Sequence, residues 1–109
     1  MIDIKDFDKV DIRIGTVVNA VLNPKAKKPA YKITVDFGGN IGVKTSSAQI
    51  TSLYTAEELT GKQVVCVINL PPRRIADVKS EILILGCQTD KGVVILQPQQ
   101  TVENGSKVF

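Results

Sequence analysis

The sequence contains no histidine. This absence excludes a Ser-His or Cys-His nucleophile pair, a histidine general base and any metal site that uses imidazole. The two cysteines, Cys66 and Cys87, fall in apolar runs without a Cys-x-x-Cys spacing. We therefore expect two buried, reduced thiols, with neither a disulfide nor a zinc site. The sequence predicts a protein that is not an enzyme and that uses no metal and no cofactor.

The sequence also lacks any long apolar run. No stretch approaches the roughly 18 residues that a membrane span needs. The first ten residues carry Asp3, Asp6 and Asp8 in place of a basic leader and an apolar segment. We expect a cytoplasmic protein with no membrane insertion.

Aromatic residues are scarce as well, at 5% with no tryptophan, whereas hydrophobic residues make up 43% of the 109 residues. The core must therefore come from Val, Ile and Leu, which favour strands. The length fits one domain, residues 1–109.

The apolar spacing predicts an all-β protein with one short helix. Tyr31, Ile33, Val35 and Phe37 alternate with polar residues, as expected for a half-buried strand. Similar patterns predict strands at 11–22, 31–37, 41–45, 62–70, 81–86 and 93–97, with the last two joined as a hairpin at 90–92.

The helix is expected between the third and fourth strands. Thr55 and Glu58 have the spacing of a capping box, and Gly61 marks the end of the helix. Residues 23–29 and 73–79 are expected as connections, the first of them a mobile basic loop. This order predicts an OB-fold, a five-stranded Greek-key barrel, with terminal extensions at 1–10 and 98–109.

Positive charge is concentrated in the middle of the chain. The net charge is +3, but residues 12–79 hold ten Lys or Arg against four acids. An anionic partner, nucleic acid first, and an ordinary solvated surface explain this distribution about equally well.

Four sequence strings occur in a characteristic order: DIRIG at 11–15, KITVDFG at 32–38, NLPPR at 69–73 and Ser80-Glu81. Together they resemble the tRNA-binding-domain family, and residues 44–51 and 69–76 resemble its CsaA branch of export chaperones. The chain departs from the family pattern at Asn23-Pro24, where the family has His-Pro, and at Ile82-Leu83, where it has Gly-Met. The resemblance implies an OB-fold, a two-fold dimer, affinity for unfolded precursor polypeptides and residual tRNA binding, although the loss of Gly-Met removes part of the tRNA-contacting pattern.

Several polar residues are candidates for binding peptide or tRNA, and each also has a structural interpretation. The Arg13 guanidinium could bind a phosphate or pair with Asp36. Asn69 and Ser80 could bind ligand, or they could cap backbone groups and begin a strand. The remaining candidates could contact ligand or form solvated surface, and they are Lys32, Lys44, Ser46, Ser47, Gln49, Arg73 and Arg74.

The apolar residues of the two ends are candidates for a dimer interface, because a closed barrel cannot bury them. They are Ile2, Ile4, Phe7, Val102, Val108 and Phe109. The leading hypothesis is a CsaA-like chaperone that binds unfolded or export-destined polypeptides as a homodimer. The alternative is a structure-specific tRNA-binding protein without a chaperone role.

Overall fold

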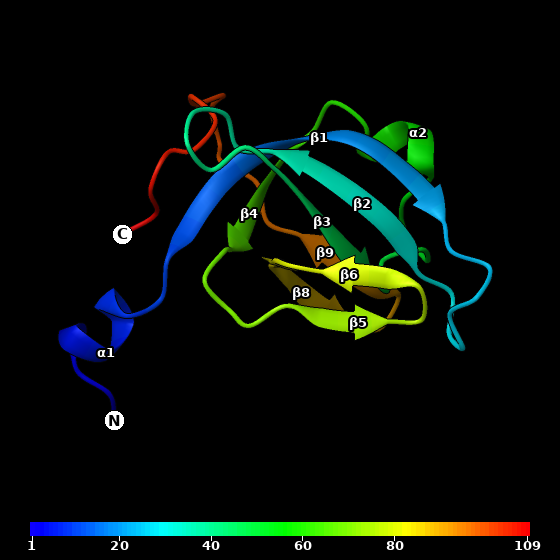
Figure 1. The fold of residues 1–109 in the computed structure, drawn as a ribbon, viewed down its shortest axis with the longest axis horizontal. Helices are drawn as coiled ribbons and strands as arrows, with labels where there is room; N and C mark the ends of the chain where they lie inside the picture. Colours follow the sequence, from blue (N-terminus) through cyan, green and yellow to red (C-terminus); the bar gives the residue numbers. More distant parts are fainter.

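A five-stranded antiparallel sheet organises the computed structural model, which describes all 109 residues. The strands follow the order β3-β2-β1-β4-β7. Their bounds are β1 (Ile12–Leu22), β2 (Tyr31–Asp36), β3 (Val43–Ala48), β4 (Gln63–Val67) and β7 (Leu83–Ile84). The sheet curls into a nearly closed barrel, with the short helix α2 (Ala56–Leu59) between β3 and β4 in sequence (Figure 1). The predicted OB-fold is confirmed.

The barrel core consists mainly of branched aliphatic side chains. Ile33 and Val35 from β2, Val64 from β4 and Leu59 from α2 are all at most 1% exposed. Phe37, just after β2, is the largest fully buried side chain. The capping box of α2 is confirmed, because Thr55 accepts from the Glu58 amide and Glu58 accepts from the Thr55 amide. Capping fixes the start of the helix, and Leu59 attaches it to the core.

The residues of β1 that face the core do not follow one regular alternation along the strand. Ile12, Ile14 and Val17 are buried, but Val18 and Leu22 are 48% and 59% exposed. The alternation in the sequence predicted that Val18 and Leu22 would face inward with Ile12 and Ile14, and this prediction is wrong. The register against β2 shifts between Val17 and Asn19, and a bulge of this kind reverses which residues face the core.

Gly15 allows the barrel to close tightly beside this bulge. A Cβ atom at Gly15 would lie 2.5 Å from Cγ1 of Val35 and 2.8 Å from Cδ1 of Phe37. Because no real side chain fits at that distance, the glycine lets the core side chains of β2 approach the backbone of β1.

The second half of the chain differs from the sequence prediction in several elements. Residues 73–80 form a hairpin in place of the predicted connection, with β5 (Arg73–Ile75), β6 (Val78–Ser80) and Ala76 at a φ of 54° in the turn. The predicted strand 81–86 divides into β7, which pairs with β4, and the start of β8 (Gly86–Thr89). The turn at 90–92 is confirmed, because β8 pairs with β9 (Gly92–Ile95). The third strand begins and ends later than predicted.

Both ends of the chain are more structured than the sequence suggested. Residues Ile4–Asp8 form a helix, α1, with its own capping box at Asp3 and Asp6. The C-terminal segment runs beside β1, where the amide of Gly105 donates to the Ile14 carbonyl and that of Val108 donates to the Ile12 carbonyl. Phe7 and Val108 both pack on the small cluster of Ile12, Ile14, Val65 and Val67, so each end of the chain is attached to the barrel. None of the helices is long and apolar enough to cross a membrane.

Candidate ligand groove

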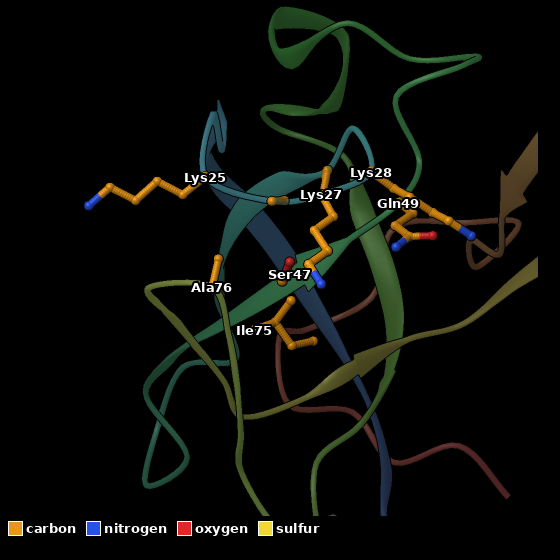
Figure 2. A pocket seen from close by; sticks show the side chains of 9 residues that line it. Lys25, Lys27, Lys28, Ser47, Gln49, Ile75 and Ala76 are labelled. Carbon is orange, nitrogen blue, oxygen red and sulfur yellow. The ribbon is translucent and has the colours of Figure 1, made fainter.

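Two adjoining cavities form a groove along the β5–β6 hairpin, between the end of β3 and the segment that follows β4. The larger, which we call the lysine cavity, has a volume of about 560 Å³. It lies between the loop 23–30, the end of β3 and the β5–β6 turn (Figure 2). Its lining residues are Lys25, Ala26, Lys27, Lys28, Ala30, Ser47, Gln49, Ile75 and Ala76.

The smaller cavity, which we call the leucine cavity, has a volume of about 210 Å³. It shares Ser47 and Ile75 with the lysine cavity, so the two cavities adjoin. Its lining residues are Ser47, Leu70, Pro71, Arg73, Ile75, Ser80, Glu81, Ile82 and Leu83.

The loop that carries the three lysines is closed at its base by hydrogen bonds. The Asn23 amide donates to the Ala30 carbonyl at 2.9 Å, and the Lys25 amide donates to Oδ1 of Asn23 at 3.1 Å. Asn23 itself is buried, and its Nδ2 has no partner in the structure. Pro24 and Pro29 prevent strand pairing, but the loop returns on itself and leads directly into β2.

The opposite wall depends on Ser80 and Glu81, which bond the free edge of β3. The Ser47 amide donates to Oγ of Ser80 at 3.2 Å, and the Thr45 amide donates to Oε2 of Glu81 at 3.0 Å. The Glu81 amide in turn donates to the Thr45 carbonyl at 2.8 Å. These two side chains supply acceptors where a neighbouring strand would otherwise do so. Ser80 and Glu81 therefore position both cavities.

The lysine cavity has a surplus of positive charge. Lys25 pairs with Asp77 across the mouth of the loop, with 3.6 Å between Nζ and Oδ2. Lys27 and Lys28 make no ion pair, and no acidic residue lines this cavity. Figure 2 shows Lys27 extending toward Ser47 and Lys28 lying beside Gln49, while Lys25 points away. The arrangement favours a negatively charged group between the loop and β3.

The structure brings four of the predicted ligand-binding residues into this groove: Ser47, Gln49, Arg73 and Ser80. Lys25, Lys27 and Lys28 also line the groove, although the sequence did not predict them as ligand-binding residues. Three lysines between two prolines are typical of any exposed loop, so their composition carries no specific signal. Only the folding of the loop against β3 and the β5–β6 turn makes them part of a cavity.

Three predicted residues lie elsewhere. Ser46 is 2% exposed, and its hydroxyl donates to the Ile82 carbonyl inside the barrel. Arg13 is near the start of β1, where Nε donates to Asp11 at 2.7 Å and Nη1 to the Gly105 carbonyl. The suggested pairing of Arg13 with Asp36 is wrong, because Asp36 instead accepts from the Gly38 amide.

Asn69 joins the end of β4 to the start of β1. Its Oδ1 accepts from the Asp11 amide at 2.9 Å, and its Nδ2 donates to the Lys9 carbonyl at 2.7 Å. Both ends of the side-chain amide are therefore engaged with backbone, which agrees with its structural interpretation.

The remaining basic candidates flank the groove without lining it. Arg74 is exposed on β5, opposite Lys79 of β6. Lys32 is exposed on β2 and borders a separate hollow beside Asn23 and Asp77. Lys44 is partly buried on β3, opposite Val35.

Comparison with known proteins identifies relatives that share this fold. The family model described as "Putative tRNA binding domain" matches residues 12–107. Among solved structures, a CsaA chaperone protein from Picrophilus torridus superposes with a TM-score of 0.95 at 45% identity, each chain covering 100% of the other. A chaperone CsaA from Bacillus anthracis gives a TM-score of 0.92 at 45% identity, with 100% of this chain and 99% of that chain covered.

Curated relatives include much longer proteins. A methionine–tRNA ligase of Archaeoglobus fulgidus is 41% identical over 98% of this chain, which covers 16% of that protein. The corresponding ligase of Pyrococcus furiosus is 36% identical over 98% of this chain, which covers 14% of the ligase. The chain therefore spans about one seventh of the ligases that it matches.

Proposed function

The chain belongs to the tRNA-binding-domain family, and from this premise we propose that it is a non-enzymatic binding module that holds unfolded polypeptides in the groove. Its clients would be unfolded or export-destined chains, bound in the cytoplasm before they fold or leave. The two CsaA chaperone structures support this proposal, because each resembles this chain over its full length.

The observation that carries the proposal is the mixed lining of the groove. Ile75 belongs to both cavities, and Leu70 and Leu83 add exposed apolar surface to the leucine cavity. Ser47 and Gln49 add hydrogen-bonding groups between this surface and the lysines. A groove with apolar area, basic edges and few fixed polar contacts suits extended chains of many sequences.

We further propose that the module works as a homodimer formed through residues 1–10 and 98–109. Helix α1 has five residues and buries none of them, although isolated helices shorter than about 12 residues are only marginally stable in water. Ile2, Ile4 and Phe109 are 75%, 70% and 102% exposed. A second copy would cover these residues and leave the lysine cavity free, because the loop 23–30 lies at the other end of the barrel from both termini (Figure 1).

Binding of tRNA is the second candidate function. The family match over residues 12–107 favours it, as do the unpaired lysines of the groove and the adjacent arginines of β5. Lys32 and Lys44 would add contacts on neighbouring strands. The ligase relatives share only this domain, and their aminoacylation chemistry lies outside the part that matches.

The chaperone proposal is tested by suppression of aggregation of a chemically unfolded, reduced client protein. The Ile75→Asp variant places a charge between the two cavities, and we expect it to need at least about fivefold more protein for the same suppression. Val94→Asp is the matched control, because Val94 is 41% exposed on β9 and lines neither cavity. Equal suppression by the Ile75→Asp variant and the wild type, with both folded by circular dichroism, would refute the groove as the client site.

A further inference from the structure

We propose that the groove selects polypeptide segments in which an acidic side chain lies close in sequence to a large apolar side chain. The acid would bind in the lysine cavity and the apolar side chain in the leucine cavity. This inference rests on the proposed function and defines the substrate class of the same groove.

The acidic half of the motif follows from the uncompensated charge of the lysine cavity. Lys27 and Lys28 are exposed and make no ion pair, and Figure 2 shows their side chains beside Ser47 and Gln49. Asp77 is engaged with Lys25 and does not line the cavity. A ligand carboxylate would therefore meet two free ammonium groups and no competing acid.

The apolar half follows from the leucine cavity. Leu70 and Leu83 are 47% and 49% exposed and face it together with the buried Ile82. Its single carboxylate, on Glu81, already accepts from the Thr45 amide. The volume of about 210 Å³ corresponds to roughly seven water molecules at about 30 Å³ each, which is enough for one large apolar side chain.

The spacing of the motif follows from the shared wall. Ser47 and Ile75 line both cavities, so the two subsites adjoin. In an extended chain, residues two apart project to the same side, about 7 Å from each other. An acid and an apolar residue separated by one position would therefore reach both cavities from one strand.

Backbone groups along the groove could hold such a strand. β5 pairs only with β6, which leaves its outer edge without a neighbouring strand. The backbone amide and carbonyl of Gln49 also make no hydrogen bond within the chain. Unpaired edges of this kind bind extended peptides by main-chain hydrogen bonds.

The lining favours polypeptide over single-stranded RNA. No aromatic residue lines either cavity, and single-stranded nucleic acid is usually held by stacking of bases on aromatic rings. A phosphate could enter the lysine cavity, but it would leave the leucine cavity empty.

The test uses ten-residue fluorescent peptides and the full-length protein. The parent peptide carries glutamate and leucine two positions apart, and the comparison peptides replace glutamate by glutamine or leucine by serine. Measured by fluorescence anisotropy, we expect the loss of either side chain to weaken binding about three- to tenfold, as expected for two exposed ion pairs or one partly buried apolar contact.

Two groove variants assign each preference to its cavity. Lys27→Gln plus Lys28→Gln should bind the glutamate and glutamine peptides alike, while keeping the preference for leucine. Leu70→Ala should lose the preference for leucine and keep that for glutamate. Lys62→Gln plus Lys91→Gln removes the same charge away from the groove and should behave like the wild type.

Equal binding of the parent and glutamine peptides by the wild-type protein would overturn the inference. A preference for glutamate that survives in the Lys27→Gln plus Lys28→Gln variant would also overturn it. So would a competition experiment in which added RNA displaces the fluorescent peptide but an unlabelled copy of the peptide does not. Aggregation suppression measured on the same samples separates the two proposals. If the protein suppresses aggregation but shows no preference among the peptides, only this inference is overturned. If it neither suppresses aggregation nor prefers the parent peptide, the proposal that the groove binds polypeptide is overturned as well.

Discussion

The two cysteines differ in solvent exposure, although their sequence contexts predicted that both would be buried. Cys66 on β4 is 0% exposed, as predicted, but Cys87 on β8 is exposed, so the prediction of two buried thiols is wrong. Desolvation raises the pKa of Cys66 from its ordinary 9.0 to about 12, because a thiolate is unfavourable in the apolar core.

The cysteines should therefore differ in reactivity. At pH 8 we expect iodoacetamide to label one thiol in the native protein, at Cys87, and two in urea, as counted by mass spectrometry. The Cys87→Ser variant should resist labelling until it is unfolded. Rapid modification of Cys66 in the native Cys87→Ser variant would contradict this expectation.

The same burial predicts a loss of stability at alkaline pH. The unfolded chain releases the Cys66 proton near pH 9, whereas the folded chain keeps it until about pH 12. The contribution of this thiol to the free energy of unfolding is thus complete below pH 9 and declines as pH rises from 9 to 12. Urea unfolding of the wild type and of Cys66→Val across this range should show a steeper decline for the wild type. Parallel curves would contradict the linkage.

At the scale of the element, side chains close the barrel beside β3. Glu81→Ala removes the acceptor of the Thr45 amide and should lower the free energy of unfolding by about 1–3 kcal/mol. Glu81→Gln keeps an acceptor oxygen and should lose less. Glu103→Ala is the control, because Glu103 is exposed and its side chain makes no hydrogen bond. Urea denaturation measures all three, and equal loss in Glu81→Ala and Glu103→Ala would contradict this role.

Substitutions in the β5–β6 hairpin can distinguish RNA binding from polypeptide binding. If Arg73 and Arg74 bind phosphates, the affinity for tRNA should fall with salt. Arg73→Ala plus Arg74→Ala should then flatten the log–log slope by roughly 0.9 for each duplex phosphate that the variant no longer neutralises. Lys5→Ala plus Lys9→Ala, outside the barrel, is the control. If the salt dependence of tRNA affinity is the same in the arginine variant and the wild type, Arg73 and Arg74 do not contact phosphates and are ordinary solvated surface residues.

At the scale of the whole molecule, the exposed ends predict self-association. We expect a dimer in sedimentation equilibrium at micromolar concentration, and a monomer for Ile4→Ser plus Phe109→Ser, because this variant removes apolar area that the barrel does not cover. Val21→Ser plus Leu22→Ser removes two other exposed apolar residues, 45% and 59% exposed, on β1 and should remain dimeric. A wild-type monomer at this concentration would refute the proposed interface.

The sequence alone determined the barrel and much of its framework. Strict alternation at Tyr31–Phe37 fixes which residues of β2 face inward, and the Thr55–Glu58 spacing fixes the start of α2, because both signals act over a few neighbouring residues. The four strings around these elements also identified the family, which the match over residues 12–107 confirms.

Only the tertiary structure decided which residues form the groove. The bulge at Val18, the hairpin at 73–80 and the packing of the lysine loop against β3 depend on partners distant in sequence. Ser46 and Ser47 are adjacent in the chain, yet one is buried against Ile82 and the other lines both cavities. The face on which a side chain lies depends on strand register, and register is set by long-range pairing that a local pattern does not contain.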